Sequence, residues 1–591
     1  MGRFLFRLFA TIGFLAVLGL IGVAGAFLWL KFSTPALPPD TVLTLELSGD
    51  LPDGPPQTGL AGLLAEKQMT LVDVLGALQR AGDDPHVKGL ALTIGGGEFH
   101  LAQVEELRDA IDAFRAKGKI VFAFSDSYGE FESGTTAYYL ASSSDEIWLQ
   151  PLGLLSLVGL RAEEPFFRGS LDKLGVAPRF DKREEYKTAM NMLTETGMTP
   201  AHREETTSLL TSLRGQIVAG IASGRKLDPA LVGTLIDKGP YLASEALDNH
   251  LIDHVDYAPA ALAALKARIG AESKTISLGH YLERVDPPHA KGPVIALIYA
   301  DGLMVRGKGG GELLGNGTMG SESVIHSFRL AERDPAVRAI LFRIDSPGGS
   351  ATAAESIWNE VKAARAGGKP VIVSMGDVAG SGGYYIAAGA DKIVAEPATL
   401  TGSIGVLAGK MLLNGISDKL GVTWDSVDTG GNAAMFSPIQ DWTPEGHARF
   451  EAMLDDVYTG FKARVSEGRS MDANAVEIVA KGRVWTGAQA KDINLVDALG
   501  GYETALALAK ASAGIAADQD VNLKTYPAPI GPVAALLDRL TGKDGDETLA
   551  LDQLGAQVQM RDLGVFGDFL RQVQLLASPP GALVMQPVEV R

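Results

Sequence analysis

The chain has 591 residues, of which 46% are hydrophobic, and it contains 70 glycines and 29 prolines. This length exceeds one ordinary core, so we expect at least two domains of a turn-rich α/β protein. The formal net charge of -18 argues against nucleic acid as a partner, because a phosphate backbone needs a basic surface. The sequence has no cysteine, and its nine histidines form no HExxH motif, so we expect no metal and no cofactor.

The first element in chain order is a predicted membrane anchor over residues 1–31. Arg3 and Arg7 precede an uncharged apolar run from Leu8 to Leu30. At about 1.5 Å per residue this run spans roughly 34 Å, enough to cross a hydrocarbon core of about 30 Å. The preceding arginines favour a cytoplasmic N-terminus and a body on the other side. Cleavage after Ala26, by a signal peptidase, is the alternative that the small residues there leave open.

The rest of the chain is a tandem duplication. VKGLALTI (87–94) resembles VRAILFRI (337–344), AYYLASSSDEIWLQP (137–151) resembles GYYIAAGADKIVAEP (383–397), and LDKLGV (171–176) resembles SDKLGV (417–422). The last two pairs share one offset, 417 - 171 = 246 residues. Similar segments in the same order at constant spacing indicate a gene duplication.

Each half is predicted to be a set of βαβ units. In the first half, apolar residues at helical spacing (Val104, Leu107, Ile111 and Phe114) separate the strands at 87–94 and 120–124. In the second half, the helix at 353–369 separates AILFRI from VIVSM. Strands this uniformly apolar indicate a parallel sheet covered on both faces. We therefore expect a first domain at 40–285, a second at 292–520, and a C-terminal extension at 521–591.

The two halves differ in the polar groups that they retain. Ser381, in VAGSGGYY, falls opposite Thr135 at the 246-residue offset, whereas Lys187, in EEYKTAM, falls opposite Ala433. A serine nucleophile needs a base, and a lysine that burial keeps uncharged can be that base. Alone, Ser381 is more typical of a turn and Lys187 of a solvated surface. Their complementary retention favours a catalytic pair.

Two further motifs complete the predicted site. In DSPGG, an amide of Gly348 or Gly349 is expected to form an oxyanion hole together with the amide of Gly382. In LTGSIGV, the Ser403 hydroxyl is placed to orient the lysine amine. Each motif alone is more typical of a structural turn or strand exit.

With DSPGG, AGSGGYY, LTGSIGV and EYKTA in fixed order, the chain resembles signal peptide peptidase A in its long, duplicated form. The resemblance extends from the anchor to about residue 520. It implies a ClpP/crotonase-like fold in each half and a Ser381/Lys187 dyad within one chain, with Ser403 orienting the lysine. It also implies a homotetramer, held by single-pass anchors in the bacterial inner membrane with its catalytic body on the periplasmic side. The implied substrates are remnant signal peptides and other extended hydrophobic peptides.

Two other classes of protein remain open on the sequence alone. One is a crotonase-type acyl-CoA hydratase or isomerase, which also uses glycine amides as an oxyanion hole. The other is a non-catalytic membrane scaffold, in which the duplicated domains serve only assembly.

Overall fold

The computed structural model describes residues 37–54, 69–285, 289–309, 318–528 and 582–584. The predicted anchor and most of the predicted C-terminal extension therefore lie outside the described residues. Within the described ranges, no helix has the length and apolar character needed to cross a membrane.

The first half is built on a six-stranded sheet in which all neighbouring strands are parallel. Its strands, in spatial order, are β8 (His254–Val255), β4 (Glu146–Leu149), β3 (Ile120–Ser125), β2 (Val87–Ile94), β1 (Thr41–Leu47) and β9 (Thr275–Ser277). The helices of this half are α3 (Leu71–Asp83), α4 (Leu101–Ala116), α5 (Thr135–Ala141), α6 (Arg168–Leu174), α7 (Asn191–Thr194), α8 (Pro200–Arg225), α9 (Pro229–Lys238), α10 (Ala243–Asp248), α11 (Ala258–Ile269) and α12 (Leu278–Leu282).

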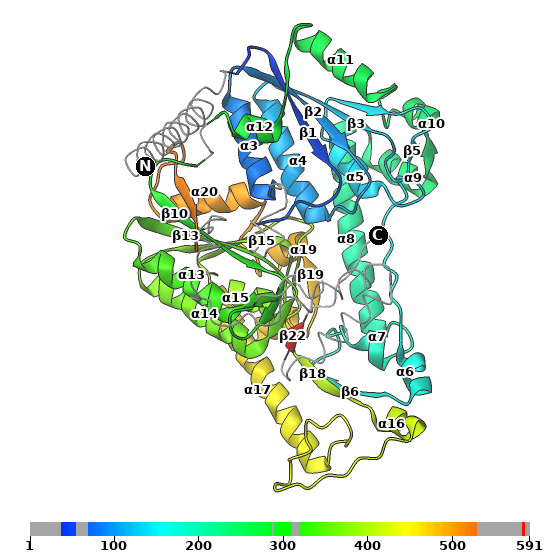
Figure 1. Cartoon of the computed structure of the whole chain (residues 1–591), viewed down its shortest axis with the longest axis vertical. Helices are drawn as coiled ribbons and strands as arrows, with labels where there is room; N and C mark the ends of the chain where they lie inside the picture. The colour runs from blue at the N-terminus through cyan, green and yellow to red at the C-terminus, as the bar shows by residue number, and fades with distance from the viewer. Residues whose placement is uncertain (1–36, 55–68, 286–288, 310–317, 529–581, 585–591) are drawn as a thin grey trace, which may run out of the picture.

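The second half repeats this plan around an eight-stranded sheet (Figure 1). Its strands are β19 (Val484–Thr486), β17 (Leu400–Gly402), β15 (Val371–Gly380), β13 (Val337–Ser346), β10 (Val294–Asp301) and β21 (Asn522–Thr525), with β16 (Lys392–Ala395) and β20 (Ala498–Leu499) off β15. The helices are α13 (Ser321–Arg333), α14 (Ala351–Ala366), α15 (Gly382–Ala387), α16 (Asn414–Leu420), α17 (Pro444–Arg469), α18 (Ala473–Val479), α19 (Gly487–Asp492) and α20 (Tyr502–Ser512). All strand pairs of this sheet are parallel except β17 with β19.

The predicted α/β class and the parallel sheets are confirmed. The helices expected at Val104–Phe114 and at 353–369 appear as α4 and α14, each connecting parallel strands. The start of α14 follows from local chemistry, because the Ser350 hydroxyl caps this helix by accepting a hydrogen bond from the Ala353 amide. Matching elements recur at the predicted offset, as in β4 and β16, whose bounds differ by 392 - 146 = 246 residues.

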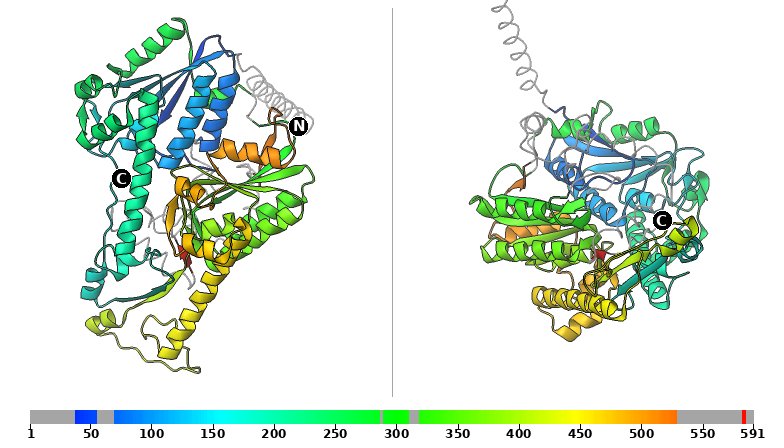
Figure 2. Two further views of the ribbon diagram at one scale, coloured as in Figure 1. Left: turned by 180° about the vertical axis from the view of Figure 1, so that it is seen from behind. Right: turned by 60° about the horizontal axis from the view of Figure 1, so that its bottom comes forward.

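Among the described residues, three smaller sheets connect or extend the two halves. β6 (Ala177–Lys182) of the first half pairs antiparallel with β18 (Leu407–Leu412) of the second. β5 (Leu154–Leu155) pairs with β7 (Tyr241–Leu242). β12 (Thr318–Gly320), β11 (Leu303–Val305), β14 (Gly348–Ser350) and β22 (Ala582–Val584) form the third. Figures 1 and 2 show α8 running from the first half down beside the second, so the halves are joined along much of their length.

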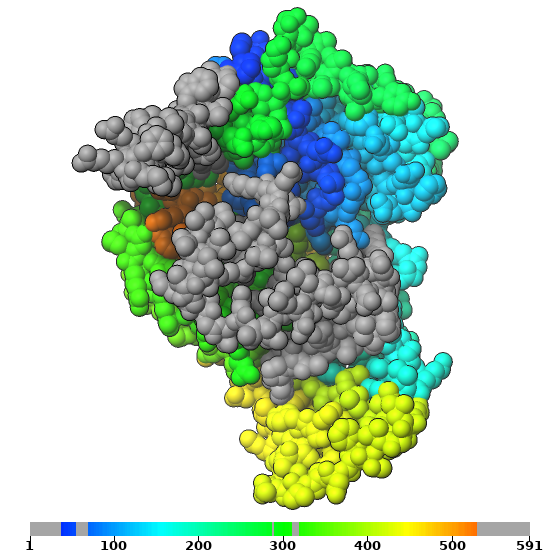
Figure 3. Space-filling view, viewed as in Figure 1, coloured from blue at the N-terminus to red at the C-terminus, as the bar shows by residue number. Residues whose placement is uncertain are grey.

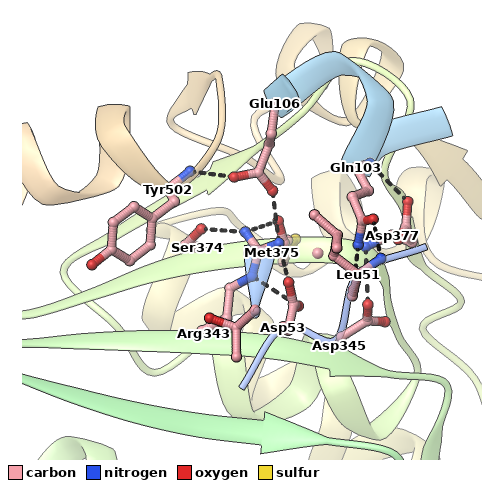
Figure 4. A network of polar contacts seen from close by, with 12 residues as sticks. Leu51, Asp53, Gln103, Glu106, Arg343, Asp345, Ser374, Met375, Asp377 and Tyr502 are labelled. Atoms are coloured by element: carbon pink, nitrogen blue, oxygen red, sulfur yellow. Dashed lines mark hydrogen bonds and ion pairs between the residues drawn. The ribbon is translucent and has the colours of Figure 1, made fainter. Parts of the chain in front are cut away.

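A buried ionic network also joins the halves (Figure 4). The Arg343 guanidinium on β13 donates to both carboxylate oxygens of Asp53, at 2.9 and 3.0 Å, and to Glu106 on α4 at 2.7 Å. The other Glu106 oxygen accepts the Tyr502 amide at 2.8 Å. Because one cation serves two buried carboxylates from the first half, separating the halves would leave charges unpaired in the interior.

Another carboxyl of this region, that of Asp345, shapes the strand that leads to the candidate site. β15 bulges where it passes β13, and Asp345 accepts hydrogen bonds there from the amides of Asp377 and Val378, at 3.3 and 3.2 Å. The bulge ends three residues before Ser381. The direction in which β15 leads to that serine therefore depends on the Asp345 carboxyl.

Candidate active site

Ser381 lies between the end of β15 and the first residue of α15. Its φ of 52° and ψ of -113° are unusual for a residue with a side chain, and its amide donates to Gly402 O at 2.8 Å. The following residues must be small, because a Cβ on Gly383 would lie 2.7 Å from Ser346 O. The glycines of VAGSGGYY thus allow a sharp strand-to-helix turn whose apex is the serine.

Lys187 reaches this serine from the first half of the chain. It follows β6, and the pairing of β6 with β18 brings this part of the first half into contact with the second half. Lys187 is only 1% exposed. The amine nitrogen Nζ lies 2.8 Å from Ser381 Oγ. Gly482 presses against the lysine backbone from the other side: a Cβ there would lie 2.6 Å from Lys187 N. The structure therefore brings together the two side chains that the halves retain separately.

Ser403 is the second residue in contact with the Lys187 amine. Its hydroxyl and its carbonyl oxygen lie 2.9 and 3.0 Å from Lys187 Nζ. Ser403 also has a positive φ, of 50°, and its amide donates to Arg483 O at 2.7 Å, which fixes the turn after β17. An uncharged amine has two N–H groups and one electron pair, so it can donate to the two Ser403 oxygens and accept a hydrogen bond from the Ser381 hydroxyl, which defines its orientation toward Ser381.

The surroundings favour an uncharged lysine. Burial lowers the pKa of the Lys187 amine to about 7, while the nearby Glu205 carboxyl acts in the opposite direction. An ordinary lysine, with a pKa near 10.5, would be almost wholly protonated at neutral pH. Near pH 7 about half of the Lys187 amines instead carry a free electron pair.

Glu205 is a site residue that the sequence analysis missed. It lies on α8 with 4% exposure, and its carboxyl accepts the Val484 amide at 2.6 Å and the Thr188 hydroxyl at 3.5 Å. Burial raises its pKa to about 8, so its uncharged form is favoured in the same pH range. The sequence feature that could have indicated its burial is its spacing: Glu205 stands four residues before Leu209, on the helix face that also carries the buried residues Leu213 and Ile217.

The three glycines predicted for the oxyanion hole meet beside Ser381. A Cβ on Gly382 would lie 3.1 Å from Gly348 Cα and 3.2 Å from Gly349 N. Gly349 has a φ of 149° and packs against Met304 O. The Gly348 amide donates to Ser346 Oγ at 3.2 Å, so an intrachain partner already occupies it. Gly349 is paired with Met304 of β11 and with Leu583 of β22, and Gly382 is the first residue of α15; we keep these two amides as the candidate donors.

The equivalent position in the first half has no such arrangement. Thr135 begins α5, is buried, and donates its hydroxyl to Gly159 O at 3.2 Å. Ala433, the counterpart of Lys187, lies exposed on a long loop. The residues described in the structure also contain no group of three or more His, Cys, Asp or Glu placed to hold a metal ion.

Comparison with known protein families identifies the class. The model for Peptidase family S49 matches residues 113–272 and 363–516, one segment in each half. The two segments cover more than half of the chain, so the chain belongs to this family of peptidases. The match supports a serine protease, and its division into two segments agrees with the duplication.

Individual relatives cover most of the chain. It is 31% identical over 556 residues to Protease 4 of Salmonella typhi, covering 90% of this chain and 87% of that protein. It is 31% identical to the chloroplastic serine protease SPPA of Arabidopsis thaliana, covering 87% and 74%. Protease 4 of Haemophilus influenzae is 30% identical, covering 80% and 79%. These matches confirm the resemblance to signal peptide peptidase A in its long, duplicated form.

Solved structures match parts of the chain. A ClpP1 mutant from Listeria monocytogenes has 16% identity and a TM-score of 0.23, covering 36% of this chain and 94% of that one. A mutant of the 1510-N membrane-bound stomatin-specific protease has 17% identity and a TM-score of 0.25, covering 40% and 99%.

Proposed function

We propose that the chain is a Ser/Lys-dyad endopeptidase, with Ser381 as nucleophile and Lys187 as general base. The observation that carries this proposal is the 2.8 Å contact between Lys187 Nζ and Ser381 Oγ. Both side chains are buried, so the lysine has little solvation to keep it charged. Membership of a peptidase family favours this function over the acyl-CoA enzyme and the scaffold.

The reaction begins when the free electron pair of the Lys187 amine accepts the Ser381 proton. Ser381 Oγ then forms a bond to the carbonyl carbon of the scissile peptide, and the carbonyl oxygen becomes an oxyanion. In this proposal the amides of Gly349 and Gly382, two glycines that lie close together next to Ser381, donate hydrogen bonds to that oxygen. Ser403 holds the amine on the Ser381 side throughout.

Collapse of the tetrahedral intermediate breaks the peptide C–N bond. The Lys187 ammonium gives its proton to the leaving amine, which departs and leaves an acyl group on Ser381. A water molecule then attacks the acyl carbon while Lys187 accepts its proton. The bond from that carbon to Ser381 Oγ breaks, Oγ takes the proton back from the Lys187 ammonium, and the product acid is released. One lysine serves both half-reactions because its pKa, about 7, lies near the working pH.

The proposed substrates are remnant signal peptides and other extended hydrophobic peptides. This proposal rests on the family and on the apolar N-terminal run at Leu8–Leu30, which would place the enzyme at the membrane that receives these peptides. We propose a single-pass anchor in the bacterial inner membrane, a catalytic body on the periplasmic side, and a homotetramer. A buried dyad in an oligomer would be accessible to extended segments and closed to folded proteins.

Hydrolysis of a fluorogenic hydrophobic peptide by matched variants tests the proposal. Ser381→Ala and Lys187→Arg are each expected to lose at least about a thousandfold in kcat/KM, because an arginine offers no free electron pair at neutral pH. Thr135→Ala, the equivalent change in the first half, is the matched control and should retain activity. Retained activity in Lys187→Arg would assign the base to another residue.

A further inference from the structure

A cavity of about 410 Å³ lies where α3 and α4 of the first half meet α20 of the second (Figure 1). In Figure 3 the blue segments of the first half lie above and to the right of the orange segments of the second. Two hydrogen bonds cross this boundary: the Gln79 side chain on α3 donates to Glu503 at 3.2 Å, and the Tyr502 amide donates to Glu106 on α4 at 2.8 Å. None of the described residues that line the cavity belongs to the candidate active site. Its volume lies in the range of about 300–1,000 Å³ that is typical of small-molecule sites.

Apolar side chains form one part of the cavity lining. Leu75 and Leu78 of α3 and Phe114 of α4 contribute to it, and all three are buried. Gly82 keeps space open beside them: an added Cβ there would have its nearest neighbours at 3.5 Å on Lys117 and at 3.8 Å on Phe114. A hydrocarbon group bound in this part of the cavity would be removed from water, which favours binding.

The rest of the lining is acidic. Among the described residues, five carboxyl side chains line the cavity against one basic side chain, that of Lys117; the five belong to Asp83, Glu106, Asp109, Glu396 and Glu503. Lys117 pairs with Asp83 at 2.6 Å, and both side chains are more than half exposed. The charge of Arg343 is shared between Asp53 and Glu106. Both cations are thus engaged by other carboxyls, and the lining keeps an excess of acidic groups.

Glu396 is the carboxyl of this lining that lacks a partner. It directly follows β16 and is 2% exposed, and its Oε1 atom has no hydrogen-bond partner among the described residues. Burial raises the pKa of the Glu396 carboxyl well above its usual range, and the charges of Glu106 and Asp109 act in the same direction. A buried acceptor without a donor is unfavourable. A bound molecule that brings a donor and a positive charge would relieve both deficits.

We propose that this cavity binds a small organic cation, with its ammonium group on the Glu396 carboxyl and its hydrocarbon part against Leu75, Leu78 and Phe114. The ammonium brings the donor that Oε1 lacks and a charge that favours the ionised carboxylate. An inorganic cation suits the lining less well, because it prefers several oxygen ligands. The described residues contain no group of three or more His, Cys, Asp or Glu placed to hold one.

Isothermal titration calorimetry of the full-length protein in a neutral detergent tests this site. The probe is n-butylammonium chloride, in a phosphate buffer free of amines at pH 7.5. Wild type should bind this probe saturably, at one site per chain. The uncharged compound 1-butanol should bind at least about tenfold more weakly, because it offers the hydrocarbon without the charge. Absence of saturable binding, or equal affinities for the two compounds, would overturn the proposal.

Glu396→Gln removes the acidic oxygen and keeps the size of the side chain. This variant should lose at least about tenfold in affinity for n-butylammonium. Glu332 on α13 is the matched control, because its Oε1 atom also has no partner among the described residues, but it does not line the cavity. Glu332→Gln should bind as wild type does. Wild-type affinity in Glu396→Gln, or equal losses in the two variants, would contradict the assignment to Glu396.

Gly82→Leu tests the apolar part of the cavity without changing a carboxyl. Gly82 lies in the last turn of α3, where an added Cβ makes only ordinary contacts and leucine is a better helix former than glycine. The leucine side chain should fill the space beside Phe114 and abolish binding of n-butylammonium. Gly215→Leu, at an open position on α8, is the control and should bind normally. Unchanged affinity in Gly82→Leu would place the bound cation elsewhere and overturn the proposal.

Discussion

The acid limb of the pH–activity profile tests the state of the lysine. Only the uncharged Lys187 amine can accept the Ser381 proton, so kcat/KM should rise with pH as the ammonium loses its proton. With a pKa of about 7, about half of the sites are active at pH 7, roughly a tenth at pH 6 and a hundredth at pH 5. Above about pH 8 the profile should be level.

The assay is hydrolysis of a fluorogenic peptide between pH 5 and pH 10, with kcat/KM taken at each pH. A lysine with its ordinary pKa of 10.5 would instead make activity climb about tenfold per unit through pH 9. A rise of kcat/KM through pH 9 would refute the claim that burial lowers the pKa of the Lys187 amine. A level profile down to pH 5 would remove lysine as the base.

Glu205→Gln separates burial from charge as the cause. Glu205 acts to raise the lysine pKa, and glutamine can still accept the Val484 amide. The half-maximal pH of this variant should therefore lie at or below that of wild type. Glu204→Gln, the exposed neighbour paired with Arg483, is the control and should leave the limb in place. If the half-maximal pH of the acid limb rose by one pH unit in Glu205→Gln, burial could not be the cause of the lowered Lys187 pKa.

Three further predictions concern the architecture around the site. Gly482→Ala should lower kcat/KM about a hundredfold, because the added Cβ would displace the Lys187 backbone. Gly514 has a similar positive φ but open space around it, so Gly514→Ala should leave kcat/KM unchanged, and equal losses in the two variants would refute the steric argument. Arg343→Met should lower the free energy of unfolding by about 3–5 kcal/mol in denaturant titration, since it strands the buried carboxylates of Asp53 and Glu106; a change below about 1 kcal/mol would show that the network is dispensable. The melting temperature should fall as pH rises from 5 to 8, because burial raises the pKa of several carboxyls to between about 6 and 8, and the folded state therefore binds more protons than the unfolded state in that range; these carboxyls are Glu105, Glu205, Asp301, Asp377 and Glu503. Lys187 contributes in the opposite direction only above pH 7. A melting temperature that rises from pH 5 to pH 8 would contradict this reasoning.

The sequence contains enough to predict the elements and the meeting of Lys187 with Ser381. Helices such as α4 and α14 carry their apolar periodicity locally, and uniformly apolar strands indicate a parallel sheet without knowledge of their neighbours. The pairing of the two side chains could be inferred because each half keeps what the other has lost. The catalytic roles assigned to them remain predictions.

Other features depend on contacts that no local pattern specifies. The pairing of β6 with β18, which carries Lys187 into the second half, joins segments more than 200 residues apart. Arg343 and Glu106 look like ordinary charged residues in the sequence, and only their mutual burial makes them a network. Occupation of the Gly348 amide by Ser346 is likewise set by one loop conformation.

Covalent labelling shows whether Ser381 is a nucleophile and whether Lys187 activates it. The full-length protein is treated with a fluorophosphonate probe at pH 8, and mass spectrometry of the digested protein locates the adduct in wild type and in Lys187→Ala. We expect one adduct in wild type, on Ser381, and labelling slowed by at least about a hundredfold when the Lys187 amine is removed. An adduct on another residue, or equal labelling rates in the two proteins, would contradict this expectation.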